Sequence, residues 1–216
     1  MTDTSANNKR IAKNTLLLYF RMLFMMAVSL YTSRVVLNAL GVEDFGIYNV
    51  VGGVVAMFSM LSGSLSAAIT RFITYELGKG NQENLKKIFS SSVTIQIGLA
   101  ILIIVVAEAI GVWFLNMKMN IPDVRITAAN WVFQFSILTF AVNLISVPYN
   151  ASIIAHERMS AFAYISILEA IGKLAIVFLI VISPMDKLIF YAILMCAVAV
   201  SYTHLRATRL LSISYA

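Results

Sequence analysis

The sequence predicts an all-α fold, a polytopic membrane bundle of about six transmembrane helices. Of its 216 residues, 60% are hydrophobic and 12% are charged, against about 25% charged residues in soluble domains. The apolar residues fall into blocks of about twenty, which is the length that a bilayer-spanning helix needs. A soluble core of this size cannot absorb so much apolar surface, so we expect the chain to span a membrane.

The first two spans are predicted at residues 15–40 and 47–72. Residues 41–46 (GVEDFG) between them are predicted to form a tight acidic turn, because glycine favours turn conformations. Glu43 and Asp44 are adjacent acids, as an active-site pair would be. We interpret them instead as solvated turn residues.

Four further spans follow, predicted at residues 93–115, 128–154, 162–182 and 188–200. Trp113 lies near the end of the third span, where an aromatic belt is expected at the membrane surface. Pro148 lies inside the fourth span and favours a kink, because proline removes a backbone hydrogen bond. The six spans together form one predicted unit, residues 1–200.

Residues 201–216 (SYTHLRATRLLSISYA) differ in character from the spans before them. They resemble the translated adaptor read-through, beginning SYTHLRA, that recurs at the ends of reading frames in metagenomic assemblies. We therefore expect a non-native tail here, a native sequence that stops near Val200 and a real protein that continues. The alternative is an ordinary basic cytoplasmic tail. No function is assigned to His204, Arg206 or Arg209.

The distribution of basic residues predicts the orientation of the bundle. With the N-terminus in the cytoplasm, the inner segments hold seven Lys and Arg residues and the outer loops hold three. Inner loops of membrane proteins carry the excess of positive charge, so a cytoplasmic N-terminus is expected. The inner residues are Lys9, Arg10, Lys13, Lys79, Lys86, Lys87 and Arg158, and the outer ones are Lys118, Arg125 and Lys187.

Several functional classes receive no support from the sequence. The net charge of +6 arises mostly in segments between the spans, where it serves topology and contact with anionic lipids rather than nucleic acid. The single cysteine, Cys196, provides no disulfide or paired metal ligands. No nucleophile elbow, zinc-binding helix, P-loop or clustered aspartate pair is present. We therefore expect neither an enzyme nor a cofactor or metal site.

Charged residues at membrane depth are the candidates for function, since each costs about 2.5–3.5 kcal/mol to insert. Arg21 and Arg34 lie in the first span, 13 residues apart, or about 20 Å along a straight helix. Both could extend to the nearest membrane surface. Alternatively, they line a cationic, water-filled cavity that binds the phosphate oxygens of an anionic substrate.

Four other charged residues carry weaker predictions. Arg71 lies at the inner end of the second span, where it anchors the helix or lines the cavity. Glu108, near Trp113, is interpreted as an interfacial or helix-paired acid. Glu169 and Lys173 are four residues apart in the fifth span, so we expect an ion pair; the same pair would respond to substrate or ions if it lined the cavity.

Four segments together resemble one known family. They are residues 14–21 (NTLLLYFR), 30–38 (LYTSRVVLN), 40–53 (LGVEDFGIYNVVGG) and 147–157 (VPYNASIIAHE). These segments are similar to the bacterial polysaccharide biosynthesis proteins, the lipid-linked O-antigen flippase type (Wzx-like) within the multidrug/oligosaccharidyl-lipid/polysaccharide (MOP) exporter superfamily. The arginines of the first span, followed by the Leu-Gly-x-x-x-Phe-Gly turn, are the most specific element.

The resemblance implies an inner-membrane transporter with two lobes of about six or seven helices facing a central cavity. Such proteins flip undecaprenyl-pyrophosphate-linked oligosaccharide units for O-antigen or capsule synthesis. This chain corresponds to roughly the N-lobe of that MATE-like fold, and the missing C-terminal lobe is its expected partner. Arg21 and Arg34 are then expected to bind the pyrophosphate or acidic sugars, with Arg71 and Lys173 as further candidates and Glu169 as a possible ion-coupling group.

Two other hypotheses remain open from the sequence. A multidrug or cation antiporter of the same superfamily is expected to carry acids rather than arginines at membrane depth in its first helix, and this chain has the reverse. A non-transporting membrane scaffold would use its buried charges only for structure. Alanine at Arg21 and Arg34 would then leave polysaccharide export intact.

Overall fold

The computed structural model describes residues 2–184 and 186–214 and, over these residues, contains helices and no strand. Five helical segments are long and apolar enough to cross a membrane: Ile11–Ala56, Gln82–Met117, Asp123–Ala155, Met159–Ile182 and Lys187–Thr208. The all-α membrane bundle predicted from the sequence is therefore confirmed. Six predicted spans correspond to five such segments because the first span and part of the second lie in one helical segment.

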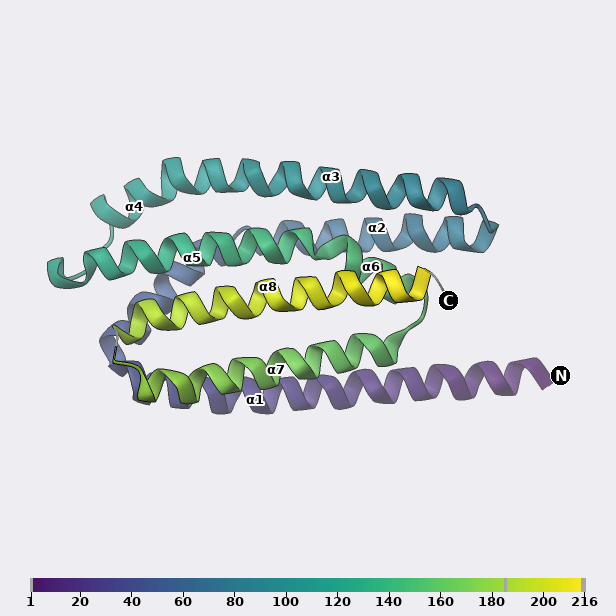
Figure 1. The fold of residues 1–216 in the computed structure, drawn as a ribbon, viewed down its shortest axis with the longest axis horizontal. Coiled ribbons are helices and arrows are strands. Elements are labelled where there is room, and N and C mark those ends of the chain that lie inside the picture. Colours follow the sequence, from purple (N-terminus) through teal and green to yellow (C-terminus); the bar gives the residue numbers. More distant parts are fainter. Residues whose placement is uncertain (1, 185, 215–216) are drawn as a thin grey trace.

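That segment is helix α1 (Thr2–Ala56), which is broken at Gly41. Gly41 has φ 84° and ψ 169°, a region that only glycine occupies readily. The chain reverses its direction along the bundle here (Figure 1). The predicted turn at residues 41–46 was therefore too long: one glycine makes the bend, and the residues after it are already helical.

The second predicted span, residues 47–72, is divided in two. The part in α1 ends at Ala56, and α2 (Ser59–Lys79) follows after a two-residue turn. The polar stretch before the third span is also mostly helical. Gly80, with φ 68°, ends α2, and the side chain of Asn81 accepts a hydrogen bond from the backbone N–H of Asn84 to begin the next helix.

The third predicted span lies in three consecutive helical pieces, α3 (Gln82–Val106), the π-helical turn η1 (Ala107–Gly111) and α4 (Val112–Met117). Gly111 allows close contact with the helix that follows. A Cβ atom there would lie 2.2 Å from the ring of Phe133, so any larger residue would force that ring to move. A loop with the short 3-10 turn η2 (Asp123–Arg125) leads onward.

The fourth predicted span is two helices, α5 (Ile126–Ile145) and α6 (Val147–Ala155). Pro148 lies in the first turn of α6, where its missing N–H costs no helical hydrogen bond. Helices α7 (Met159–Ile182) and α8 (Lys187–Ser214) complete the bundle. Helix α8 continues well past Val200, so the sixth helix is longer than predicted. Its helical form has no bearing on whether the tail is native.

The helices run roughly along one long axis (Figure 1), with α1 beside α7, α5 beside α8, and α2 beside α6. The largest core cluster includes the fully buried Val51, Val132, Phe133 and Leu188. The N-terminus and the α2–α3 and α6–α7 turns lie at one end, here called the N-terminal end. The Gly41 bend and the loops before α5 and α8 lie at the other, the Gly41 end.

The fold keeps the two predicted sets of basic residues apart. Lys79, Lys86 and Arg158 lie in or beside the turns of the N-terminal end, whereas Lys118 and Lys187 lie beside the loops of the Gly41 end. The basic residues that favour a cytoplasmic location are thus gathered at one end of the bundle.

Candidate functional site

Arg21 is held between α1 and α7. Its Nη1 donates a hydrogen bond to Oγ of Ser166 over 2.9 Å, and its Cζ lies 4.5 Å from the ring centroid of Phe162. Its Nε is buried and has no hydrogen-bond partner among the described residues. The side chain as a whole is partly exposed, and a guanidinium has five N–H groups, so Arg21 retains the capacity to bind an anion.

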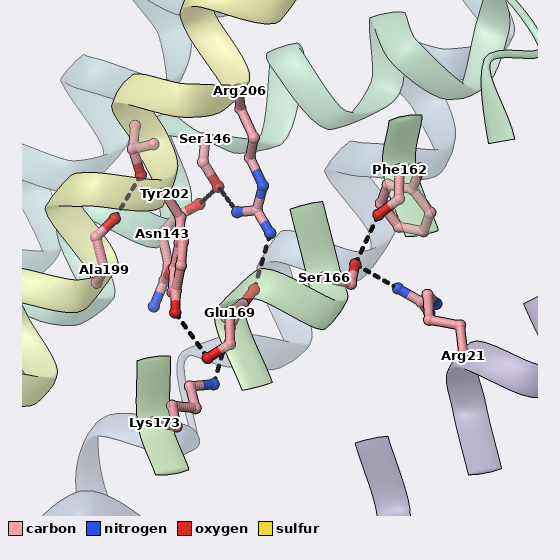
Figure 2. Close-up of polar contacts among 11 residues, drawn as sticks. Arg21, Asn143, Ser146, Phe162, Ser166, Glu169, Lys173, Ala199, Tyr202 and Arg206 are labelled. Carbon is pink, nitrogen blue, oxygen red and sulfur yellow. Dashed lines mark hydrogen bonds and ion pairs between the residues drawn. The ribbon is translucent and has the colours of Figure 1, made fainter. Parts of the chain in front are cut away.

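Glu169 and Lys173 form the ion pair that their spacing predicted. Nζ of Lys173 lies 2.8 Å from Oε1 of Glu169, and the two side chains are 36% and 19% exposed. Ser166 and Glu169 are three residues apart on α7 and therefore lie on neighbouring positions of one face. Arg21 and the Glu169–Lys173 pair consequently lie along the same side of α7 (Figure 2).

The depth of this group follows from its position in α7. Ser166 is seven residues from Met159, where α7 begins, and Glu169 is 13 residues from Ile182, where it ends. At 1.5 Å per residue these positions are about 10 Å and about 20 Å from the two ends. An α7 that spans a hydrocarbon core about 30 Å thick therefore places these charges within that core.

Two residues of the predicted non-native tail also contact Glu169 (Figure 2). Nη2 of Arg206 lies 3.1 Å from Oε2 of Glu169, and its Nη1 donates to Oγ of Ser146 over 3.2 Å. The hydroxyl of Tyr202 donates to the backbone carbonyl of Glu169 over 2.7 Å. No sequence pattern predicted these contacts, which depend on residues of the tail.

Two predicted site residues lie apart from Arg21. Arg34 is exposed on α1, and the 13 residues between them turn the helix so that the two side chains point about 140° apart. Arg71 is exposed on α2, a helix that packs mainly against α6 and α3 rather than α7. The cationic group predicted from the sequence is therefore dispersed within this bundle: Lys173 is on α7 and Arg21 contacts α7 from α1.

A second charged group, at the Gly41 end, was not predicted. Asp44 is 3% exposed and pairs with Nη2 of Arg125, while Nη1 of Arg125 pairs with Asp186. Arg125, in the η2 turn, thus links the part of α1 that follows the Gly41 bend to the α7–α8 loop. The interpretation of Asp44 as a solvated turn residue was wrong, because the Gly41 bend places it against the η2 turn.

Glu108 is a helix-paired acid, one of the two roles predicted for it. It lies in the π-helical turn η1 and accepts a hydrogen bond from Nε2 of Gln134 on α5 over 3.1 Å. Glu43 is exposed, unlike its sequence neighbour Asp44. Within the described residues, no group of three His, Cys, Asp or Glu side chains is placed to hold a metal ion.

A recess of about 320 Å³ lies between α1, α7 and α8. Its polar lining consists of Ser29, Thr32, Ser33, Asn49 and Lys173, together with the phenol rings of Tyr48 and Tyr191. We call it the α1–α7–α8 recess. It begins at Met25, one helical turn from Arg21.

Comparison with known proteins identifies a family. The family model described as polysaccharide biosynthesis protein matches residues 11–215. Neither the curated proteins nor the solved structures provide a match. The family match covers nearly the whole chain and confirms the resemblance that the segments around Arg21 and Gly41 carried. The chain belongs to the polysaccharide biosynthesis protein family.

Proposed function

We propose that the protein is a transporter that flips undecaprenyl-pyrophosphate-linked oligosaccharide units across the bacterial inner membrane, for O-antigen or capsule synthesis. Family membership supports a role in polysaccharide biosynthesis. The observation that carries the transport step is Arg21, a partly exposed guanidinium at membrane depth that donates from Nη1 to Ser166. A pyrophosphate group would accept hydrogen bonds from its other N–H groups.

In this proposal the bundle is one of two lobes, and a second lobe of the same kind closes the cavity. Arg34 supports this view, because it lies on the same side of α1 as Leu16, Tyr19, Phe20, Leu23 and Leu30, which are all more than 60% exposed. Lipid covers apolar side chains but does not solvate a guanidinium, so Arg34 would face the second lobe. The proposed orientation has the N-terminus in the cytoplasm.

The experiment deletes the gene in its native bacterium and restores it with variants. Arg21→Ala is expected to reduce surface polysaccharide at least tenfold and to let lipid-linked units accumulate in the inner leaflet, because the anion loses its charged partner. Arg21→Lys should retain part of the activity, since it keeps the charge but not the planar fork. Arg158→Ala is the matched control, an exposed arginine in the α6–α7 turn.

The alternatives give different outcomes at equal protein level. If Arg21→Ala leaves export intact, the arginine is structural and the scaffold hypothesis is favoured. If deletion changes resistance to cationic drugs while surface polysaccharide is unchanged, the protein is an antiporter. Arg34→Ala, Arg71→Ala and Lys173→Ala variants test the remaining candidate residues in the same assay.

A further inference from the structure

The α1–α7–α8 recess contains polar groups at membrane depth that no neighbouring helix satisfies. The hydroxyl of Thr32 is buried and has no hydrogen-bond partner among the described residues. Ser29 and Ser33 lie one turn or less away on α1 and line the same recess. Polar side chains at membrane depth face the bundle interior, water or a ligand rather than lipid, so these hydroxyls mark the recess as a place for water or a polar ligand.

The described lining of the recess offers no unpaired charge to an ion. Its single cationic side chain, Lys173, is already 2.8 Å from the carboxylate of Glu169. The pair carries no net charge, while the ammonium still has N–H groups to donate. Asn49 donates its amide N–H to the backbone carbonyl of Phe45 over 2.8 Å, which leaves its side-chain oxygen as an acceptor.

The remaining lining is apolar and aromatic. Val28 and Met25 contribute aliphatic surface, and the rings of Tyr48 and Tyr191 pack together with centroids 4.7 Å apart. A recess with neutral donors and acceptors on one wall and aromatic or aliphatic surface on another fits a sugar ring. Such a ring has hydroxyl groups around its edge and an apolar C–H face. The volume is at the lower end of the range for small-molecule sites.

We propose that the α1–α7–α8 recess binds one neutral sugar residue, with hydrogen bonds from Thr32 and Lys173. The inference rests on the proposed function and adds detail to it: the anionic group of the substrate binds at Arg21, and a sugar binds in the recess. Arg21 lies one helical turn, or about 6 Å, from Met25 at the edge of the recess. An anionic group at Arg21 and a sugar attached directly to it would therefore lie side by side along α1 and α7.

The test measures weak binding by saturation-transfer difference NMR on the purified chain in nanodiscs. The probes are the methyl glycosides of glucose, galactose and N-acetylglucosamine, with methyl phosphate as the anionic probe. At least one glycoside is expected to give a signal that falls threefold or more in Thr32→Val, which keeps the shape of the side chain and removes the hydroxyl. Thr94→Val, at an exposed threonine of α3, should behave like the wild type.

The Arg21→Ala and Thr32→Val variants test the recess proposal and the proposed transport function separately. Glycoside signals should survive Arg21→Ala, whereas any methyl phosphate signal should disappear in that variant. The recess proposal is overturned if no glycoside gives a signal, if Thr32→Val matches the wild type, or if methyl phosphate displaces the glycoside from the recess. Equal thermal stability of the Thr32→Val and wild-type proteins shows that the site rather than the fold was changed. Loss of export in Arg21→Ala, measured in cells, would support the proposed transport function whether or not the recess binds a sugar.

Discussion

At the scale of single residues, burial decides which charges matter to stability. The Lys87–Glu83 pair has a short contact of 2.7 Å, yet its side chains are 67% and 79% exposed. Exposed pairs of this kind contribute about 0–1 kcal/mol. Asp44 has a side chain only 4% exposed, and its partner Arg125 is 32% exposed. An acid in that position needs its counter-charge, because water no longer solvates it.

We predict that Asp44→Asn lowers the free energy of unfolding by about 2–3 kcal/mol. This lies at or below the range for breaking a buried ion pair, since Arg125 is partly exposed and keeps Asp186 as a partner. The measurement is denaturant or thermal unfolding of the detergent-solubilised protein. Glu83→Gln, at the exposed pair, is the control and should change stability by less than about 1 kcal/mol.

A double-mutant cycle identifies the contact responsible. Asp44→Asn combined with Arg125→Gln should destabilise less than the sum of the two single variants, because each single variant already removes the same pair. Fully additive effects would show that Asp44 and Arg125 act on stability through different contacts.

At the scale of elements, helix boundaries depend on local backbone conformation. The two glycines with positive φ, Gly41 and Gly80, stand where α1 bends and where α2 ends. Glu43 and Asp44 interrupt the apolar run just after Gly41. This interruption predicted two spans, while the bend itself depends on one residue that can adopt this backbone conformation.

We predict that Gly41→Ala costs about 1–3 kcal/mol of stability, the cost of holding a side chain in this backbone region. Neither Gly41 nor Gly46 has any heavy atom within 4 Å of an added Cβ, so an alanine side chain clashes with nothing at either position. Gly46 is helical, and Gly46→Ala should be neutral or slightly stabilising. Equal thermal stability of the two variants would contradict the role assigned to the Gly41 bend.

At the scale of the whole molecule, the arrangement of charge sets the orientation in the membrane. The turns at the N-terminal end and the loops at the Gly41 end lie on opposite ends of the bundle (Figure 1). The positive-inside rule counts Lys and Arg and gives little weight to acids. The predicted orientation therefore depends on the seven basic residues of the inner segments against the three of the outer loops.

We predict a cytoplasmic N-terminal end, which single-cysteine labelling will test in a Cys196→Ala background. A cysteine at Asn81, in the exposed α2–α3 turn, should react with a membrane-impermeant maleimide only after spheroplasts are permeabilised. A cysteine at Val124, which is 92% exposed at the other end, should react in intact spheroplasts. The reverse pattern would invert the topology, and equal labelling at both sites would indicate a mixed orientation.

The sequence by itself determined the fold class, the approximate positions of the spans, the Glu169–Lys173 pair and the family. These properties follow from composition, from blocks of apolar residues and from spacing within one helix, all of which are local. Only the tertiary structure decided that Asp44 is buried, that Arg21 contacts Ser166 and that Thr32 faces a recess. Contacts between residues 81 or 145 positions apart depend on how helices pack, and no local pattern specifies that packing.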